Sequence, residues 1–358
     1  MAWTSRPEFA LLQELVAIHS VSGTEEVIAR RVEQWAREAG LNVRRDDAAV
    51  AVTVPGRAPG ETLALVSHLD TVPAGEGWTR PAFEPTLDDD RLYGRGSGDA
   101  KASVAAMLMA ARDVAEGGGP ARGRLLVVLG YEEETRHTTM GTAVARLGPI
   151  DAAVVGEPTN LEFAIAQRGL MMVDLIARGV QRHAGYAADE PDFTNAIVEL
   201  GRNLARLPSL FKDRVHPVLG VAAVTPTMLE GGVSRNVTPP VARAVLDVRS
   251  TPSWTHAELA EVLRSELDVE VVVTSDRLVP CETPSGSRLL RVAGSVRPEG
   301  RPFGSPTCSD WVFLRDCDAI KCGPGTSRRS HTPDEYVDLP EVSAARLFYR
   351  QLAQAYLA

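Results

Sequence analysis

The sequence predicts an α/β fold, because short apolar runs typical of buried strands alternate with helical patterns through much of the chain. The chain has 358 residues and 44% of them are hydrophobic, so it can bury a large core and exceeds the usual size of one domain. From about Gln167 the expected order changes to strand, helix, strand, strand, helix, strand. We therefore expect a large α/β domain that is interrupted by a smaller α/β sandwich.

Two helices are expected at the start of the chain. The first covers residues 7–18, and the second begins at Thr24, a suitable N-cap before two glutamates, and stops at Gly40. The apolar stripe of the second helix consists of Val27, Ile28, Val32 and Trp35. Buried strands are expected next at 49–54, 62–67, 125–129 and 152–155, with a long helix at 101–116.

The second part of the chain is expected to form the inserted sandwich. Its strands are predicted at 170–177, 222–229, 241–248 and 269–273, and its helices at 195–207 and 256–267. After residues 280–284 the sequence returns to a helix, a glycine-rich loop at 321–331 and a terminal helix at 340–355. Residues 1–166 and 284–358 are thus predicted to form one discontinuous domain, and residues 167–283 the other.

The composition excludes several classes of protein. The formal net charge is -9 and no long basic stripe occurs, so a nucleic-acid partner is not expected. No apolar run approaches the ~20 residues of a membrane span, and the first ten residues lack a signal core, so we expect a cytoplasmic protein without a membrane partner. The cysteines have no paired zinc spacing and are expected to be reduced thiols.

Five side chains of the metal-binding type are spread along the chain, each after a strand-like run or a glycine-rich turn. They are His68, Asp99, Glu134, Glu157 and His331. Taken singly, each is more often structural, as Asp99 would be if it were only an N-cap. Together, two imidazoles and three carboxylates can hold two zinc-like ions if one carboxylate bridges them. Because side chains at strand ends meet at one edge of an α/β sheet, these residues are expected to converge.

Two further features support a catalytic metal site. Asp70 lies two residues after His68 on an extended segment, so it points the same way and can orient the imidazole. The acidic triplet 132–134 ends an apolar strand, where three negative charges are unfavourable without cations. Because neighbours in a turn face different ways, one glutamate can bind metal while the adjacent one takes a proton from water.

The motifs resemble the dinuclear zinc peptidase family that contains acetylornithine deacetylase and succinyl-diaminopimelate desuccinylase. The matching segments are 67–70 (Ser-His-Leu-Asp), 94–101, the triplet 132–134, 156–159 (Gly-Glu-Pro-Thr) and 330–335 (Ser-His-Thr-Pro-Asp-Glu). The family usually has Asp-Glu-Glu where this chain has three glutamates. The resemblance implies a mixed-sheet catalytic domain with helices on both faces, and a ferredoxin-like insert that serves as a lid and dimerisation domain.

The resemblance also implies a role for each site residue. His68 and Glu157 would bind one metal ion, Glu134 and His331 the other, and Asp99 would bridge them. Asp70 would orient His68, and Glu133 would be the general base. Zinc is the expected metal, and cobalt is an alternative because histidine and carboxylate ligands accept both.

The insert contains further segments that resemble the family. Residues 179–185 match the segment whose histidine, here His183, reaches the active site of a partner subunit and stabilises the oxyanion, which implies a homodimer. Residues 231–239 and 247–249 resemble motifs that meet the substrate, which makes Asn236 and Arg249 candidates for substrate binding; an arginine fork suits an α-carboxylate. Gly325, in the Gly-Pro-Gly loop of the catalytic domain, is a third candidate.

Residues 302–310 and 323–331 most resemble the branch that removes the acyl group from Nα-acylated ornithine or citrulline. The expected function is therefore metal-dependent hydrolysis of the amide bond of an Nα-acyl amino acid, in arginine or lysine biosynthesis, by a water that is held between the metals and activated by Glu133. The alternatives are release of lysine or ornithine from an amino-group carrier protein, and metallo-aminopeptidase or carboxypeptidase activity.

Two other classes of function fit the sequence less well. A serine or cysteine hydrolase would need an activated nucleophile, but the chain has no nucleophile-elbow motif, and Cys308 has no base beside it in sequence. A non-catalytic metal-binding sensor or scaffold would not need a general base. The presence of Glu133 and His183 therefore favours an enzyme.

Overall fold

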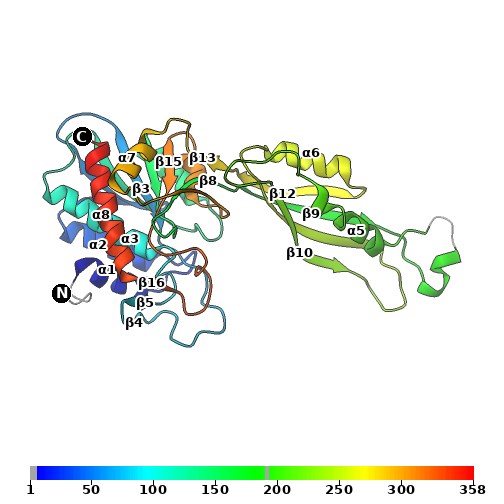
Figure 1. Cartoon of the computed structure of the whole chain (residues 1–358). Coiled ribbons are helices and arrows are strands. Elements are labelled where there is room, and N and C mark those ends of the chain that lie inside the picture. The colour runs from blue at the N-terminus through cyan, green and yellow to red at the C-terminus, as the bar shows by residue number, and fades with distance from the viewer. Residues whose placement is uncertain (1–5, 190–192) are drawn as a thin grey trace. The chain divides into compact units, whose positions relative to one another are not determined.

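A computed structural model describes residues 6–189 and 193–358, which form two compact units (Figure 1). Within the described residues, the first unit comprises 6–165, 282–303 and 309–358, and the second comprises 166–189, 193–281 and 304–308. Residues 304–308 group with the second unit, although the sequence assigned them to the catalytic domain. The reason is local: the Arg168 N–H donates to the Ser305 carbonyl at 3.1 Å, and Gly304 lies against the Val218 backbone.

The first unit is built on a mixed sheet, as predicted. Its order is β1-β2-β6-β3-β7-β15-β8-β13, with β14 paired to β8. The strands are β1 (Asn42–Arg45), β2 (Ala49–Pro55), β3 (Thr62–His68), β6 (Arg124–Gly130), β7 (Ala152–Val155), β8 (Phe163–Gln167), β13 (Cys281–Glu282), β14 (Pro302–Ser305) and β15 (Asp318–Lys321). The central strands β6, β3, β7 and β15 run parallel, whereas β1 and β2 are antiparallel to their neighbours. The carboxyl ends of the parallel strands therefore share one edge.

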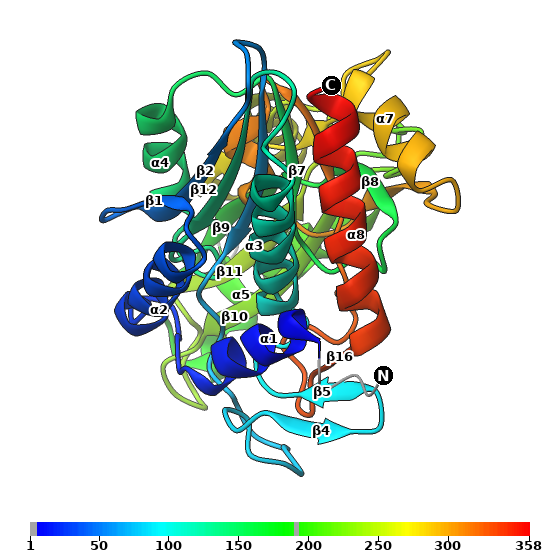
Figure 2. The same ribbon diagram turned by 90° about the vertical axis from the view of Figure 1, so that its left-hand side faces the viewer.

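Helices cover both faces of this sheet, as predicted. They are α1 (Pro7–Ala17), α2 (Glu26–Glu38), α3 (Lys101–Glu116), α4 (Thr139–Leu147), α7 (Arg288–Val296) and α8 (Leu339–Tyr356). Leu63 and Leu65 of β3 belong to the core that includes α1, α2, α3, α7 and α8. Ala64 and Val66 are also buried and face the opposite side, where α4 packs on β6 and β2. Figure 2 shows α3 and α8 side by side against the sheet.

Helix α2 departs from the prediction at its start. It begins at Glu26, because the Thr24 hydroxyl donates to the Val21 carbonyl at 2.6 Å and so closes a turn instead of capping the helix. Val27, which was assigned to the apolar stripe, is 62% exposed. The buried residues include Ile28, Val32 and Ala36, which follow one another at intervals of four and so share one face.

A small three-stranded sheet in the first unit was not predicted, because its strands are too short to show alternation. It has the order β16-β5-β4, with β4 (Thr86–Asp88), β5 (Arg91–Tyr93) and β16 (Tyr336–Asp338). The Arg329 guanidinium lies 3.8 Å from the centre of the Tyr336 ring and 3.0 Å from an Asp338 oxygen. These contacts anchor the loop that carries His331 to this sheet.

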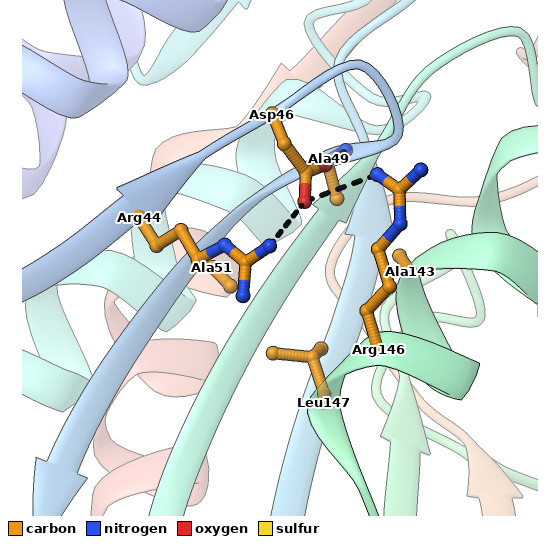
Figure 3. A pocket seen from close by; sticks show the side chains of 7 residues that line it. All are labelled: Arg44, Asp46, Ala49, Ala51, Ala143, Arg146 and Leu147. Atoms are coloured by element: carbon orange, nitrogen blue, oxygen red, sulfur yellow. Dashed lines mark hydrogen bonds and ion pairs between the residues drawn. The ribbon is translucent and has the colours of Figure 1, made fainter.

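An ion-pair cluster joins the β1–β2 turn to α4 (Figure 3). One oxygen of Asp46 lies 3.3 Å from Arg44 and 3.2 Å from Arg146. Because both arginines are exposed, solvent screens these ion pairs and they add little to stability. These charged residues, three alanines and Leu147 line a pocket at this place.

The second unit has the predicted element order and a ferredoxin-like sheet. Its elements are β9 (Leu170–Arg178), η2 (Ala184–Asp189), α5 (Ala196–Leu204), η3 (Leu207–Ser209), β10 (Ala223–Gly231), β11 (Val241–Arg249), α6 (His256–Glu266) and β12 (Glu270–Leu278). The strands are antiparallel in the order β10-β11-β9-β12. Helix α5 ends three residues before its predicted end, and a separate 3-10 turn contains Pro208, which has no N–H for an α-helix. The role of this unit as a lid and dimerisation domain stays a prediction.

The structure also bears on the cysteines and on membrane-spanning helices. The four cysteines, all in the described residues, form no disulfide bond. Among the helices of the described residues, none combines the length and the apolar character that a bilayer crossing needs.

His256 fixes the start of α6 inside the second unit. The imidazole is buried, with Nδ1 2.6 Å from the Asp276 carbonyl and Nε2 2.8 Å from the Ser250 hydroxyl. A carbonyl only accepts, so Nδ1–H donates to Asp276 and Nε2 accepts from Ser250. Burial lowers the pKa of His256 below its ordinary value, although the Asp276 carbonyl opposes this shift.

We expect His256→Asn to destabilise the protein by about 1–2 kcal/mol at pH 7.5, because the two hydrogen bonds are lost. The difference from wild type should shrink as the pH falls below about 6.5. There the unfolded chain binds a proton that the folded imidazole resists, so the stabilisation by His256 is lost on acidification. Urea midpoints of both proteins at pH 7.5 and 5.5 test this. A difference that does not change with pH would contradict it.

Candidate metal centre

The five predicted ligand side chains all lie in the first unit, and the structure brings them together. His68 is the last residue of β3, Glu157 and Glu134 follow β7 and β6, Asp99 precedes α3, and His331 lies in the loop before β16. Parallel strands therefore deliver three of them to the same sheet edge.

Asp99 lies between the two histidines. Its Oδ1 is 3.3 Å from His68 Nε2, and its Oδ2 is 3.7 Å from His331 Nε2. Glu157 approaches the same His68 nitrogen at 3.8 Å, and Glu134 approaches the His331 nitrogen at 2.9 Å. Each oxygen of Asp99 thus lies nearest a different histidine, and each of these histidines lies beside one glutamate. Two cations that share a bridging carboxylate need this arrangement, although the ligand roles themselves remain predictions.

The electrostatics of the cluster also fit bound cations. Burial, reinforced by the charge of Asp99, raises the pKa of Glu157 to about 8. Burial and the same carboxylate raise the pKa of Glu134. Carboxylates that are buried close to one another are unfavourable unless cations compensate them. The residues present therefore fit a pair of divalent ions.

Asp70 supports this cluster from behind. His68 Nδ1 lies 3.0 Å from the Asp70 carbonyl and 3.4 Å from its carboxylate. The carboxylate accepts the N–H groups of Glu133 and Glu134, at 3.1 and 3.0 Å, and the Ser22 hydroxyl at 2.7 Å. Asp70 therefore holds both the imidazole and the acidic turn, and its contact with Ser22 was not predicted.

Glu133 is buried but does not join the Asp99 cluster. Burial raises its pKa well above the ordinary value, and the nearby Glu157 carboxylate adds to this shift. A carboxylate with a raised pKa can accept a proton from water and later release it. Its place beside the cluster, one residue from Glu134, is consistent with the predicted role of general base.

Glu335 is a supporting residue to which the sequence reasoning assigned no role, although it ends the Ser-His-Thr-Pro-Asp-Glu motif. Its buried carboxylate accepts the N–H groups of Gly96, Gly98 and Asp99 at 2.9–3.1 Å, and it pairs with Arg95 at 2.7 Å. It therefore holds the glycine-rich loop that places Asp99. Only the fold reveals this contact, because the two segments are more than 200 residues apart.

Glu335→Gln is expected to lower the affinity for metal by about 10–100-fold, because the loop that carries Asp99 loses its charged anchor. Competition with a chromophoric chelator measures this change. Glu84→Gln, an exposed substitution in the same unit, serves as the control and should leave the affinity unchanged. Equal affinities in all three proteins would exclude a positioning role.

The remaining predicted residues are divided between the units. Gly325 lies in the first unit, has a φ of +79°, and comes close to Gly98. His183 and Asn236 lie on neighbouring segments of the second unit, where both side chains are exposed. His183 Nδ1 accepts the Gly185 N–H at 3.1 Å.

Arg249, a candidate for binding a substrate carboxylate, forms an ion pair within its own strand. Its Nε and one terminal nitrogen bind the two oxygens of Asp247 at 2.7 and 3.0 Å. Residues two apart on a strand share a face, which explains the pairing. To bind a carboxylate of the substrate through Nε, Arg249 would first have to release Asp247.

The site places the buried Asp99 between two histidine–glutamate pairs, with Glu133 beside them. This arrangement is that of the class of dinuclear metallohydrolases. The model of peptidase family M20/M25/M40 matches residues 64–355. The chain therefore belongs to this family, whose members are metallopeptidases and metallo-amidohydrolases. It is 32% identical to acetylornithine deacetylase of Myxococcus xanthus, over 93% of each chain. It is 29% identical to a succinyl-diaminopimelate desuccinylase of Cereibacter sphaeroides, over 97% of this chain and 98% of the relative.

Solved structures show the same fold at lower identity. An M20 family metallo-carboxypeptidase from Sulfolobus solfataricus aligns with a TM-score of 0.81 at 17% identity, over 98% of this chain and 99% of the other. A dinuclear metal-binding peptidase of the family from Bacillus subtilis aligns with a TM-score of 0.76 at 15% identity, over 98% and 97%. These structures support the fold and do not decide the substrate.

Proposed function

We propose that this protein hydrolyses the amide bond of an Nα-acyl amino acid, with acetylornithine and related acyl amino acids as the substrate class. The observation that carries the proposal is the convergence of His68, Asp99, Glu134, Glu157 and His331 beside the buried Glu133. The names of the relatives with about 30% identity support an acylated amino acid, either acetylated or succinylated.

The proposed chemistry assigns a task to each residue. Two divalent cations, zinc by expectation with cobalt as the alternative, would supply Lewis acidity and lower the pKa of water. Glu133 removes a proton from the attacking water and returns it to the leaving amine. Asp70 keeps the His68 ring in place through Nδ1. His183, contributed by a second subunit, would donate to the oxyanion, an effect worth about 10²–10³ in rate.

The test is the release of free α-amine from Nα-acetyl and Nα-succinyl derivatives of ornithine, citrulline, lysine and diaminopimelate. Each compound is tested with metal-loaded and with chelator-stripped protein. Metal-dependent turnover of one member supports the proposal and identifies the acyl group. Turnover that survives chelation would contradict it. Hydrolysis of dipeptides or of a carrier-protein conjugate alone would move the assignment to the peptidase or carrier alternatives.

A homodimer through the second unit is part of the proposal. Strand β10 is at the edge of the four-stranded sheet. Met228 and Leu229 on this strand are 55% and 67% exposed, and Ile197 and Val198 of α5 are exposed as well. An exposed apolar edge strand is a template for pairing with another chain. A second copy of this chain would cover it.

Leu229→Asp is expected to convert the dimer to a monomer, because a charge on the edge strand opposes strand pairing. Light scattering of the protein as it elutes from a size-exclusion column measures its molar mass. Leu87→Asp, a similar change at an exposed leucine of β4 in the first unit, is the control and should stay dimeric. If wild type is monomeric at micromolar concentration, the dimer proposal is wrong.

A further inference from the structure

We propose that the protein has a third cation site, formed by Glu133, His137 and Asp310, and that a divalent cation bound there inhibits the enzyme by occupying the general base. The inhibitory effect rests on the proposed function, since it requires that Glu133 act as the base. The existence of the site does not depend on that function. Neither His137 nor Asp310 has a task in the proposed reaction.

The three side chains have the spacing of a metal site. His137 Nδ1 lies 3.2 Å from Asp310 Oδ1 and 3.8 Å from Glu133 Oε1, and one ligand atom from each residue lies within 4.8 Å of the other two. Tetrahedral zinc with bonds of about 2.1 Å places its ligand atoms about 3.4 Å apart. Only small side-chain rotations are therefore needed to bind an ion. In the described part of the chain, the only other group with this spacing is His68, Asp99 and Glu134.

The charge and burial of this triad favour a cation. The side chains of Asp310, Glu133 and His137 are only 3%, 8% and 12% exposed. Asp310 Oδ2 is buried and has no hydrogen-bond partner among the residues that the structure describes. Buried carboxylates are normally paired with a cation or hydrogen-bonded. A divalent ion would compensate both carboxylates of the triad at once.

The backbone directs Glu134 to the Asp99 cluster and Glu133 to the triad with His137 and Asp310. The N–H groups of Glu133 and Glu134 both donate to the Asp70 carboxylate, which fixes the turn. From this turn Glu134 reaches His331, while Glu133 reaches toward His137. One imidazole nitrogen and two carboxylates are ligands that zinc accepts. The third site is therefore separate from the Asp99 cluster, and the general base is one of its ligands.

Binding at this triad has a defined consequence for activity. A cation bound to the Glu133 carboxylate lowers the basicity of that group, so it accepts the proton from water less readily. Activity should therefore rise as the first two equivalents of zinc bind and fall again as a third, weaker equivalent binds.

The experiment counts bound zinc by equilibrium dialysis of the full-length protein at increasing free Zn²⁺, and measures hydrolysis of the best substrate at the same concentrations. Wild type should bind two tight equivalents and one weaker one, with inhibition that follows the third. His137→Gln should keep the two tight equivalents and move the inhibitory zinc concentration upward by at least about 10–100-fold. His19→Gln is the matched control, because His19 lies outside both the Asp99 cluster and the triad of Glu133, His137 and Asp310. This variant should behave as wild type.

Each outcome decides the proposal. If His137→Gln still binds the third equivalent and is still inhibited as wild type is, the third zinc is an adventitious ion only, and the proposal is overturned. The proposal is also overturned if wild type binds only two equivalents and is not inhibited. If His137→Gln loses the tight equivalents through misfolding, Glu133→Gln, a substitution of nearly equal size, replaces it in the zinc count. Absence of any hydrolysis would instead contradict the proposed function, and the zinc count would still test the site.

Discussion

Glu133→Gln is expected to lower kcat by about 10²–10⁴-fold while the protein keeps its two tightly bound metal ions. Glutamine has nearly the same size as glutamate and can occupy the buried position, but its amide cannot accept a proton near neutral pH. The metal cluster itself should persist, because the close contacts around Asp99 come from other residues. Turnover of the acyl amino acid and the metal content of the purified variant measure the two effects separately.

The neighbouring residue provides a matched control for this substitution. Glu132 belongs to the same acidic triplet, but its Oε2 accepts the Thr138 hydroxyl at 3.2 Å, outside the metal cluster. Glu132→Gln should retain wild-type kcat. If Glu133→Gln kept full activity, the assignment of the base would be wrong. If Glu132→Gln lost activity instead, the base would have to be sought in that residue.

Asp99→Ala is expected to lower the affinity for both metal ions by more than about 100-fold and to abolish turnover. Asp99 is the side chain that lies beside both histidines, at 3.3 Å from His68 and 3.7 Å from His331. Its removal leaves each prospective ion with one histidine and one glutamate, too few ligands for a stable zinc site. Isothermal titration of the metal-free variant with Zn²⁺ measures the affinity.

Asp316→Ala is the control for this change, because its side chain is 97% exposed. It should bind two zinc ions as wild type does. Retention of one tight ion by Asp99→Ala would show that Asp99 serves a single metal and does not bridge two.

Much of the fold was predictable because its signals are local. The bounds of α3 and β7 agree with the apolar patterns, and the element order of the second unit follows from the alternation of strands and helices. The strands of the β16-β5-β4 sheet were missed because three residues are too few to show a period. The start of α2 was placed two residues early because Thr24 closes a turn to Val21, a contact that capping preferences do not anticipate.

The candidate site was predictable only in part. The five ligand residues were expected to converge, because their types suit metal binding and because of their positions after strands. Their roles came from the resemblance to a family. Glu335, which holds the glycine-rich loop, and the pairing of Arg249 with Asp247 were not anticipated. Hydrogen bonds of this kind depend on the exact placement of side chains, which periodicity does not specify.

The sequence by itself determined the α/β class, the inserted second unit and the set of metal-type side chains, because these depend on local patterns of apolar and polar residues. Only the tertiary structure decided which side chains share a contact: that Asp99 lies between two histidines, that Asp70 holds both His68 and the acidic turn, and that Glu133 faces His137 and Asp310. The physical reason is that the decisive contacts join residues far apart in the chain, such as His68 and Asp99, 31 residues apart, and His137 and Asp310, 173 residues apart. Only the packing of the sheet and its loops brings such residues within bonding distance.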